Sequence, residues 1–154
     1  MSNLLAISPF ECNLITKIIF ACILGGFIGF SREKEGKAAG LRTHILVCIG
    51  ATIFTMLSFM AFSMFPNVDP TRIASNVLIG IGFIGAGTII RNAGGSISGI
   101  TTAASIWIAA AIGMSISFEL YHVAIFTTAL TLIVLHSLHR LEKKYIHDKD
   151  KPLN

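Results

Sequence analysis

Five long apolar stretches, separated by short polar segments, constrain the fold of this chain more than any other feature. They lie at residues 13–30, 41–65, 73–90, 99–117 and 120–138. A helix needs about 20 apolar residues to cross the hydrocarbon of a bilayer. Inside lipid, every backbone polar group must find its partner within the protein. We therefore expect an all-α integral membrane bundle of five transmembrane helices.

The composition excludes an ordinary water-soluble domain. Apolar residues make up 53% of the 154 residues and charged residues only 13%, whereas soluble domains carry about 25% charged residues. No shift in composition marks a second domain. We expect one transmembrane domain over residues 1–138, followed by a short charged cytoplasmic tail over residues 139–154.

The distribution of basic residues predicts the orientation of the bundle. With five crossings, ten of the 12 Lys and Arg residues fall on the side of the C-terminus, and only Lys17 and Arg72 fall on the other side. Loops rich in Lys and Arg stay in the cytoplasm. We expect the N-terminus outside the cell and the C-terminus in the cytoplasm. The net charge of +4 then indicates contact with anionic membrane lipids rather than with nucleic acid.

Glycines recur at helical spacing within the apolar stretches. Gly25 and Gly29 follow Ala21 at intervals of four residues, and residues 105–113 contain a similar row of small side chains. Small residues allow helix backbones to approach closely in lipid. We expect the first, third and fourth helices to form a tightly packed centre. The expected packing positions are Gly25, Gly29, Gly82, Gly85 and Gly87.

Residues 80–85, with the sequence GIGFIG, also match the G-x-G-x-x-G fingerprint of dinucleotide-binding folds. We reject that match because the segment lies within a membrane helix and no acidic residue occurs between Asp69 and Glu119 to bind a ribose. No Asp or Glu lies in the middle of an apolar stretch, and the three cysteines show no metal-binding spacing. We expect no cofactor, no bound metal and no enzymatic activity.

Charged side chains are densest between the first two helices. Arg32, Glu33 and Arg42 occur there, and Arg91 should reach the same membrane face. One interpretation is a solvated loop that anchors the protein to lipid. The alternative is an ion-pair cluster, with Arg32 and Arg42 on either side of Glu33, that fixes the loop or holds an anionic ligand.

Two further polar segments lie at helix starts. Thr101 and Thr102 either bond backbone carbonyls within the fourth helix or line a polar cavity that faces the first and third helices. Asp69 is expected to cap the third helix, with Pro70 at the first helical position.

Three sequence runs resemble the bacterial MgtC/SapB family. They are GGFIGFSREKEGKAAGLRTHILVCIGA (25–51), DPTRIASNVLIGIGFIGAGTIIR (69–91) and GITTAASIWIAAAIG (99–113), and their order and spacing agree with the family. The resemblance implies a five-helix protein of the bacterial inner membrane that is associated with magnesium homeostasis and, in intracellular pathogens, with virulence. The residues that match the family pattern are Arg32, Arg42, Arg72, Gly82, Gly85, Gly87, Arg91, Thr101 and Thr102.

The chain also differs from the family pattern. Ser31 stands where members commonly have Glu. Longer members carry a cytoplasmic domain after the fifth helix, so we expect this chain to be a short form that has the membrane domain only.

Two functions are compatible with these features. The leading hypothesis is a non-enzymatic membrane protein that acts by helix–helix contacts in magnesium or ion homeostasis, or as a regulator of a membrane complex. The alternative is a small transporter or channel for Mg²⁺ or another solute, with a path lined by Thr101, Thr102, Asn76 and the arginine cluster. The expected partners are membrane lipids, further copies of the chain in a dimer or larger homo-oligomer, and another membrane protein.

Overall fold

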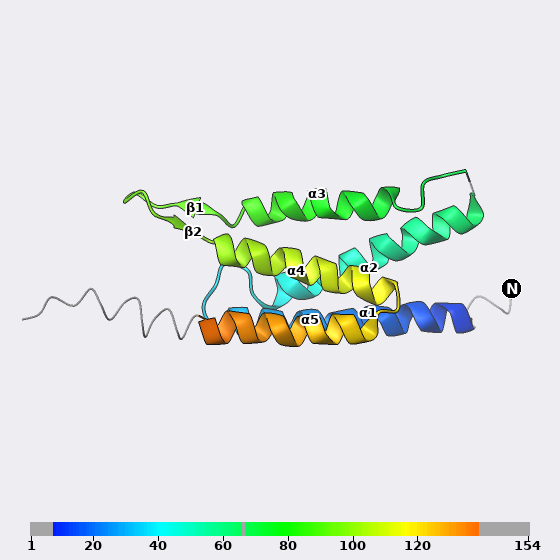
Figure 1. The fold of residues 1–154 in the computed structure, drawn as a ribbon, viewed down its shortest axis with the longest axis horizontal. Coiled ribbons are helices and arrows are strands. Elements are labelled where there is room, and N and C mark those ends of the chain that lie inside the picture. The colour runs from blue at the N-terminus through cyan, green and yellow to red at the C-terminus, as the bar shows by residue number, and fades with distance from the viewer. Residues whose placement is uncertain (1–7, 66, 139–154) are drawn as a thin grey trace, which may run out of the picture.

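The computed structural model describes residues 8–65 and 67–138, which form five helices and a small β-hairpin (Figure 1). The strands β1 (Ile90–Arg91) and β2 (Ile97–Ser98) pair antiparallel. The predicted tail over residues 139–154 lies outside the described residues. The helices are α1 (Pro9–Lys34), α2 (Leu41–Met64), α3 (Arg72–Ala86), α4 (Ile100–Ser117) and α5 (Tyr121–Ile133), and a π-helical turn (Val134–Leu138) continues α5.

Three of these helices, α1, α2 and α4, are long and apolar enough to cross a membrane. The helices α3 and α5 are apolar but shorter. With 15 residues, α3 is roughly 22 Å long at 1.5 Å per residue, against roughly 30 Å of hydrocarbon. The predicted helical bundle is confirmed, and three of its helices are suitable for spanning a membrane. Five complete crossings remain a prediction, although consecutive helices do run in alternating directions (Figure 1).

The first helix begins earlier than the apolar pattern predicts. It starts at Pro9 rather than at residue 13, because Ser8 and Glu11 form a reciprocal cap. The backbone N–H of Glu11 donates to Oγ of Ser8 at 3.2 Å, and the backbone N–H of Ser8 donates to Oε2 of Glu11 at 2.7 Å. Such a capping box satisfies two N–H groups that lack acceptors within the helix.

The third helix ends four residues before the predicted boundary at residue 90. It stops at Ala86, and the apolar pair Ile89-Ile90 leads into a hairpin instead. The turn of the hairpin contains Gly95, which has a φ of +83° and whose N–H donates to the Asn92 carbonyl oxygen at 2.9 Å. The fold is therefore not purely helical, because this glycine-containing turn connects two short strands.

The cap of α3 also differs from the prediction. The helix starts at Arg72, and Asp69 accepts hydrogen bonds from the N–H and the hydroxyl of Thr71 in a turn before the helix. These bonds, with the backbone N–H contributing most, lower the pKa of the Asp69 carboxyl below its ordinary value. The N–H groups of residues 73 and 74, in the first turn of α3, donate to Oγ of Ser58 on α2, at 3.2 and 3.3 Å.

The centre of the bundle is formed by α2 and α4 rather than by the predicted first, third and fourth helices. In Figure 1, α3 lies along one side of α2 and α4, and α1 and α5 lie along the other. The helix α4 contributes to both apolar clusters, with Ile112 and Ile116 facing α1 and α5, and Ile106 and Ala109 facing α3. Most of the apolar side chains of α2 are large. The search for glycines therefore did not predict that this helix lies at the centre.

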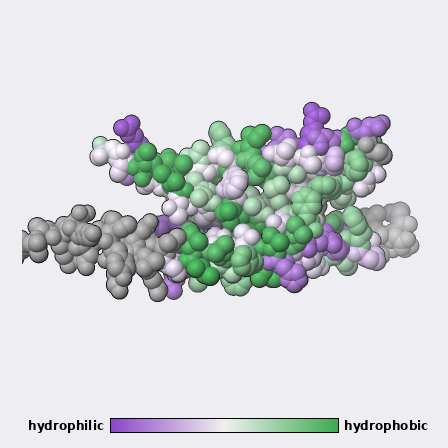
Figure 2. Space-filling view, viewed as in Figure 1, coloured by the Kyte–Doolittle hydropathy of each residue, from purple (hydrophilic) through white to green (hydrophobic). Residues whose placement is uncertain are grey.

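Polar groups gather toward the two ends of the bundle. The α1–α2 loop, the hairpin and the π-helical turn after α5 lie at one end, called here the basic end, which carries Arg32 and Arg91 (Figure 1). Toward the opposite end, the buried Nζ of Lys17 lies 2.9 Å from Oε1 of Glu119 and ties α1 to the α4–α5 turn. Figure 2 shows hydrophobic side chains covering much of the middle of the visible face. This pattern suits a bundle surrounded by lipid.

Candidate functional site at the basic end

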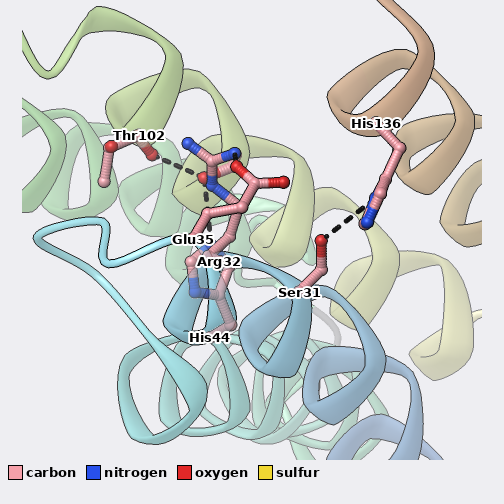
Figure 3. A network of polar contacts seen from close by, with 7 residues as sticks. Ser31, Arg32, Glu35, His44, Thr102 and His136 are labelled. Atoms are coloured by element: carbon pink, nitrogen blue, oxygen red, sulfur yellow. Dashed lines mark hydrogen bonds and ion pairs between the residues drawn. The ribbon is translucent and has the colours of Figure 1, made fainter. Parts of the chain in front are cut away.

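Arg32 is the most deeply buried charged side chain at the basic end. It lies in the last turn of α1 with 2% of its surface exposed. Its Nη1 donates to Oε2 of Glu35 at 2.7 Å (Figure 3). Its Nε is also buried and has no acceptor within the described residues. A buried guanidinium with an unused donor is costly unless another group supplies the acceptor.

His44 joins the α1–α2 loop to α4. Its fully buried ring lies in the first turn of α2, where Nδ1 donates to the Gly40 carbonyl oxygen at 2.9 Å. Its Nε2 lies 3.0 Å from Oγ of Ser105, and that Oγ lies 2.8 Å from the Thr102 carbonyl oxygen. The Ser105 hydroxyl has a single proton, and both Nε2 of His44 and the Thr102 carbonyl oxygen lie within its hydrogen-bonding reach. Figure 3 shows His44 and Thr102 in the same polar network, which passes close to Arg32 in this view.

The predicted bracket of Glu33 by two arginines does not form. Glu33 accepts a hydrogen bond from the N–H of Leu41 at 2.6 Å and so caps the start of α2. Arg32 pairs with Glu35 instead, because a spacing of three residues places both side chains on one face of the helix end. Arg42 is exposed and has no ion-pair partner in the described part of the chain.

The remaining predicted polar residues lie at the two opposite ends of the bundle. Thr102 is buried and Thr101 is exposed at the start of α4, and both line a pocket that also touches Arg32. Arg91 lies exposed on β1 at the same end. Arg72 begins α3 at the opposite end, because α3 runs antiparallel to α2 and parallel to α1 (Figure 1). Arg72 therefore lies apart from Arg32 and Arg91, on the other side of the bundle, where the count of basic residues also places it.

The polar path suggested for transport is likewise divided. Asn76 lines an apolar pocket between α2 and α3, whereas Thr101 and Thr102 line a different pocket at the basic end. Within residues 8–65 and 67–138, no group of three or more His, Cys, Asp or Glu side chains could hold a metal ion.

The predicted packing glycines fall into two groups. A Cβ at Gly25 would lie 2.8 Å from the His44 carbonyl oxygen, and one at Gly29 would lie 2.7 Å from Cα of Leu41, so α1 and α2 are in close backbone contact there. Gly85 lies at ordinary contact distance from α4. Gly82 has no atom within 4 Å of such a Cβ, and Gly87 meets only carbonyls of the preceding turn. The predicted packing at these last two positions does not hold within one chain.

The sequence matches the MgtC family over residues 18–144, which include most of α1, the hairpin and all the other helices. The chain belongs to the MgtC family.

Several family relatives are similar over most of this chain. YhiD of Escherichia coli K12, whose name describes it as a candidate magnesium transporter, is 44% identical over 135 residues, which are 84% of this chain and 62% of YhiD. SrpB of Synechococcus elongatus is 35% identical over 141 residues, which are 85% of this chain and 78% of SrpB. The MgtC protein of Brucella abortus strain 2308 is 43% identical over 94 residues, which are 61% of this chain and 38% of that protein.

The chain spans less than two thirds of the length of YhiD. No solved structure matches the fold of this family member.

Sequence reasoning missed the partners that His44 and Lys17 find in the structure. The separation in sequence is 61 residues from His44 to Ser105. No local spacing pattern signals a contact of that length. One signal was available for Ser105, since it lies in the row of small residues on the fourth helix, which predicts an interface.

Proposed function

We propose that this family member is a non-enzymatic protein of the bacterial inner membrane that acts through helix–helix contacts in magnesium or ion homeostasis. The family match and the three long apolar helices support its place in a membrane. The name of its relative YhiD supports a connection with magnesium. The observation that supports the contact mechanism is the composition of the exposed face of α3, called here the outward face.

This outward face combines large apolar side chains with two small ones. Ile79 and Phe83 are 72% and 84% exposed. Gly82 and Ala86, four residues apart, are also exposed on α3, and nothing in the described chain lies within 4 Å of a Cβ at Gly82. A pair of small residues at this spacing lets the backbone of a second helix approach closely in lipid. Two copies of one helix can meet symmetrically at such a pair.

We therefore propose a second copy of the chain as the partner at this face. Gly82→Leu should convert a dimer or larger oligomer into a monomer in mild detergent, measured by light scattering after size exclusion. The fold of the single chain should persist, because a Cβ at this exposed position has no atom within 4 Å. Ala129→Leu, which adds bulk at an exposed position on α5, is the matched control and should leave the oligomer unchanged. An unaltered oligomer in Gly82→Leu, or a monomeric parent protein, would contradict this mechanism.

A second candidate function is solute transport, favoured by the name of YhiD and by the polar pocket at the basic end. Purified protein in liposomes, loaded with a fluorescent Mg²⁺ indicator, separates the two functions. A Mg²⁺ influx above that of empty liposomes supports transport, and the absence of influx supports the contact mechanism.

A further inference from the structure

A polar pocket lies at the basic end, between the end of α1 and the start of α4. Its volume is about 340 Å³, enough for a group larger than a single water or halide ion. It lies at the end of the bundle rather than along its apolar middle. The residues that line it are Arg32, Lys37, Ile97, Ser98, Gly99, Ile100, Thr101 and Thr102.

The first turn of α4 supplies N–H donors to this pocket. The residue before the helix is Gly99, with a φ of +92°, and no side chain caps the helix start. The first helical hydrogen bond runs from the N–H of Ala103 to the Gly99 carbonyl oxygen at 2.9 Å. The N–H groups of Ile100, Thr101 and Thr102 therefore have no acceptor within the helix. An uncapped helix start with its positive dipole end attracts anions.

Arg32 provides the second, independent feature. Its side chain is nearly fully buried and lines the same pocket. Glu35 accepts from Nη1 only, and Nε has no acceptor among the described residues. The planar guanidinium has five donors and pairs well with the oxygens of a phosphate group. Phosphate oxygens in the pocket would accept from the guanidinium N–H groups that Glu35 does not use.

Lys37 is the second cation that lines the pocket. It is half-buried in the α1–α2 loop, and the described part of the chain gives it no ion-pair partner. The carboxylate of Glu33 is engaged elsewhere, since it caps α2. Two cations and one paired carboxylate leave the pocket positive, and fixed N–H donors add to that field.

We propose that this pocket binds a phosphate group, held by the N–H groups at the start of α4, by Arg32 and by Lys37. The group is either free inorganic phosphate or the phosphate in the headgroup of an anionic lipid, since both present the same oxygens. The assignment goes beyond the proposed contact mechanism, which involves a different face of the molecule.

The test uses the full chain and changes only pocket residues that lie outside the buried ion pair. In a neutral maltoside detergent at constant ionic strength, titration calorimetry with sodium phosphate measures free phosphate. In nanodiscs, native mass spectrometry measures phosphatidylglycerol retained from a mixture with phosphatidylcholine. Lys37→Gln should weaken the binding of phosphate or the retention of phosphatidylglycerol about tenfold, as expected for one charge-assisted hydrogen bond. Lys34→Gln, an exposed lysine at the same end but outside the pocket, should change neither.

A second variant tests the helix start directly. Thr101→Asp places a carboxylate in the first turn of α4, where it would take the position of the bound anion. It should abolish phosphate binding while raising the melting temperature of the protein. Phosphate binding without phosphatidylglycerol retention identifies free phosphate as the ligand, and the reverse identifies the lipid headgroup. Binding of neither probe, or equal losses in Lys37→Gln and Lys34→Gln, would overturn the proposal.

Discussion

Single polar residues at the basic end decide how the loop and the helices meet. Arg32 and His44 are both buried, and each makes specific hydrogen bonds to groups from a neighbouring turn or helix. Burying such groups without partners costs about 1–3 kcal/mol each. Their pairing therefore stabilises one particular arrangement of the α1–α2 loop against the start of α4.

The His44–Ser105 contact gives a prediction at this scale. Ser105→Ala removes the only side-chain partner of Nε2 within the described residues and should lower the free energy of unfolding by about 1 kcal/mol. Chemical denaturation in detergent, followed by circular dichroism, measures the change. Ser75→Ala is the control, because the Ser75 hydroxyl is exposed and bonds only the backbone of its own helix. Equal losses in the two variants would show that the buried contact contributes nothing.

Among the elements, α2 and α4 are in close backbone contact. Gly113 of α4 faces the Cys48 carbonyl oxygen, which leaves no space for a Cβ. The hydroxyl of Thr52 donates to the Gly113 carbonyl oxygen at 2.9 Å, and the hydroxyl of Ser117 donates to the Thr52 carbonyl oxygen at 2.6 Å. Backbone contact and interhelical hydrogen bonds are the interactions that hold helices together in lipid.

The contact between α2 and α4 at Gly113 should tolerate no added side chain. Gly113→Leu should separate α2 from α4 and destabilise the protein by about 1–3 kcal/mol, the usual cost of overpacking. Ala104→Leu lies on the exposed side of the same helix and should have little effect. Thermal unfolding in detergent compares the two variants. If Gly113→Leu melts at the temperature of the parent protein, then α2 and α4 are not in backbone contact.

The sequence predicted elements better than it predicted contacts. Apolar length placed all five helices, because crossing lipid requires long uninterrupted apolar runs. The same signal failed at Ile89-Ile90, where an apolar pair forms the approach to a hairpin. Glycine spacing predicted a packing position at both Gly29 and Gly82. Only Gly29 lies in a helix–helix contact, and Gly82 is exposed. Spacing along one helix says which residues share a face, and only the packed structure says what that face meets.

At the scale of the whole molecule, the charged side chains and the exposed apolar side chains lie in different regions. The basic end gathers the cations of the α1–α2 loop and the hairpin, and large apolar side chains such as Phe126 and Leu46 are exposed along the helices. This division predicts that the bundle lies across the membrane with the basic end in the cytoplasm. The proposed phosphate pocket would then face the cytoplasmic leaflet or the cytosol.

The orientation of the bundle is the claim on which these assignments depend most directly. Single cysteines at Asn67, between α2 and α3, and at Gly94, in the hairpin turn, report the two ends of the molecule. They are introduced into a variant in which Cys12, Cys22 and Cys48 are replaced by Ser or Ala. A membrane-impermeant maleimide should label Asn67→Cys in intact cells and Gly94→Cys only after lysis. Labelling of Gly94→Cys in intact cells, or equal labelling of both positions, would contradict the account.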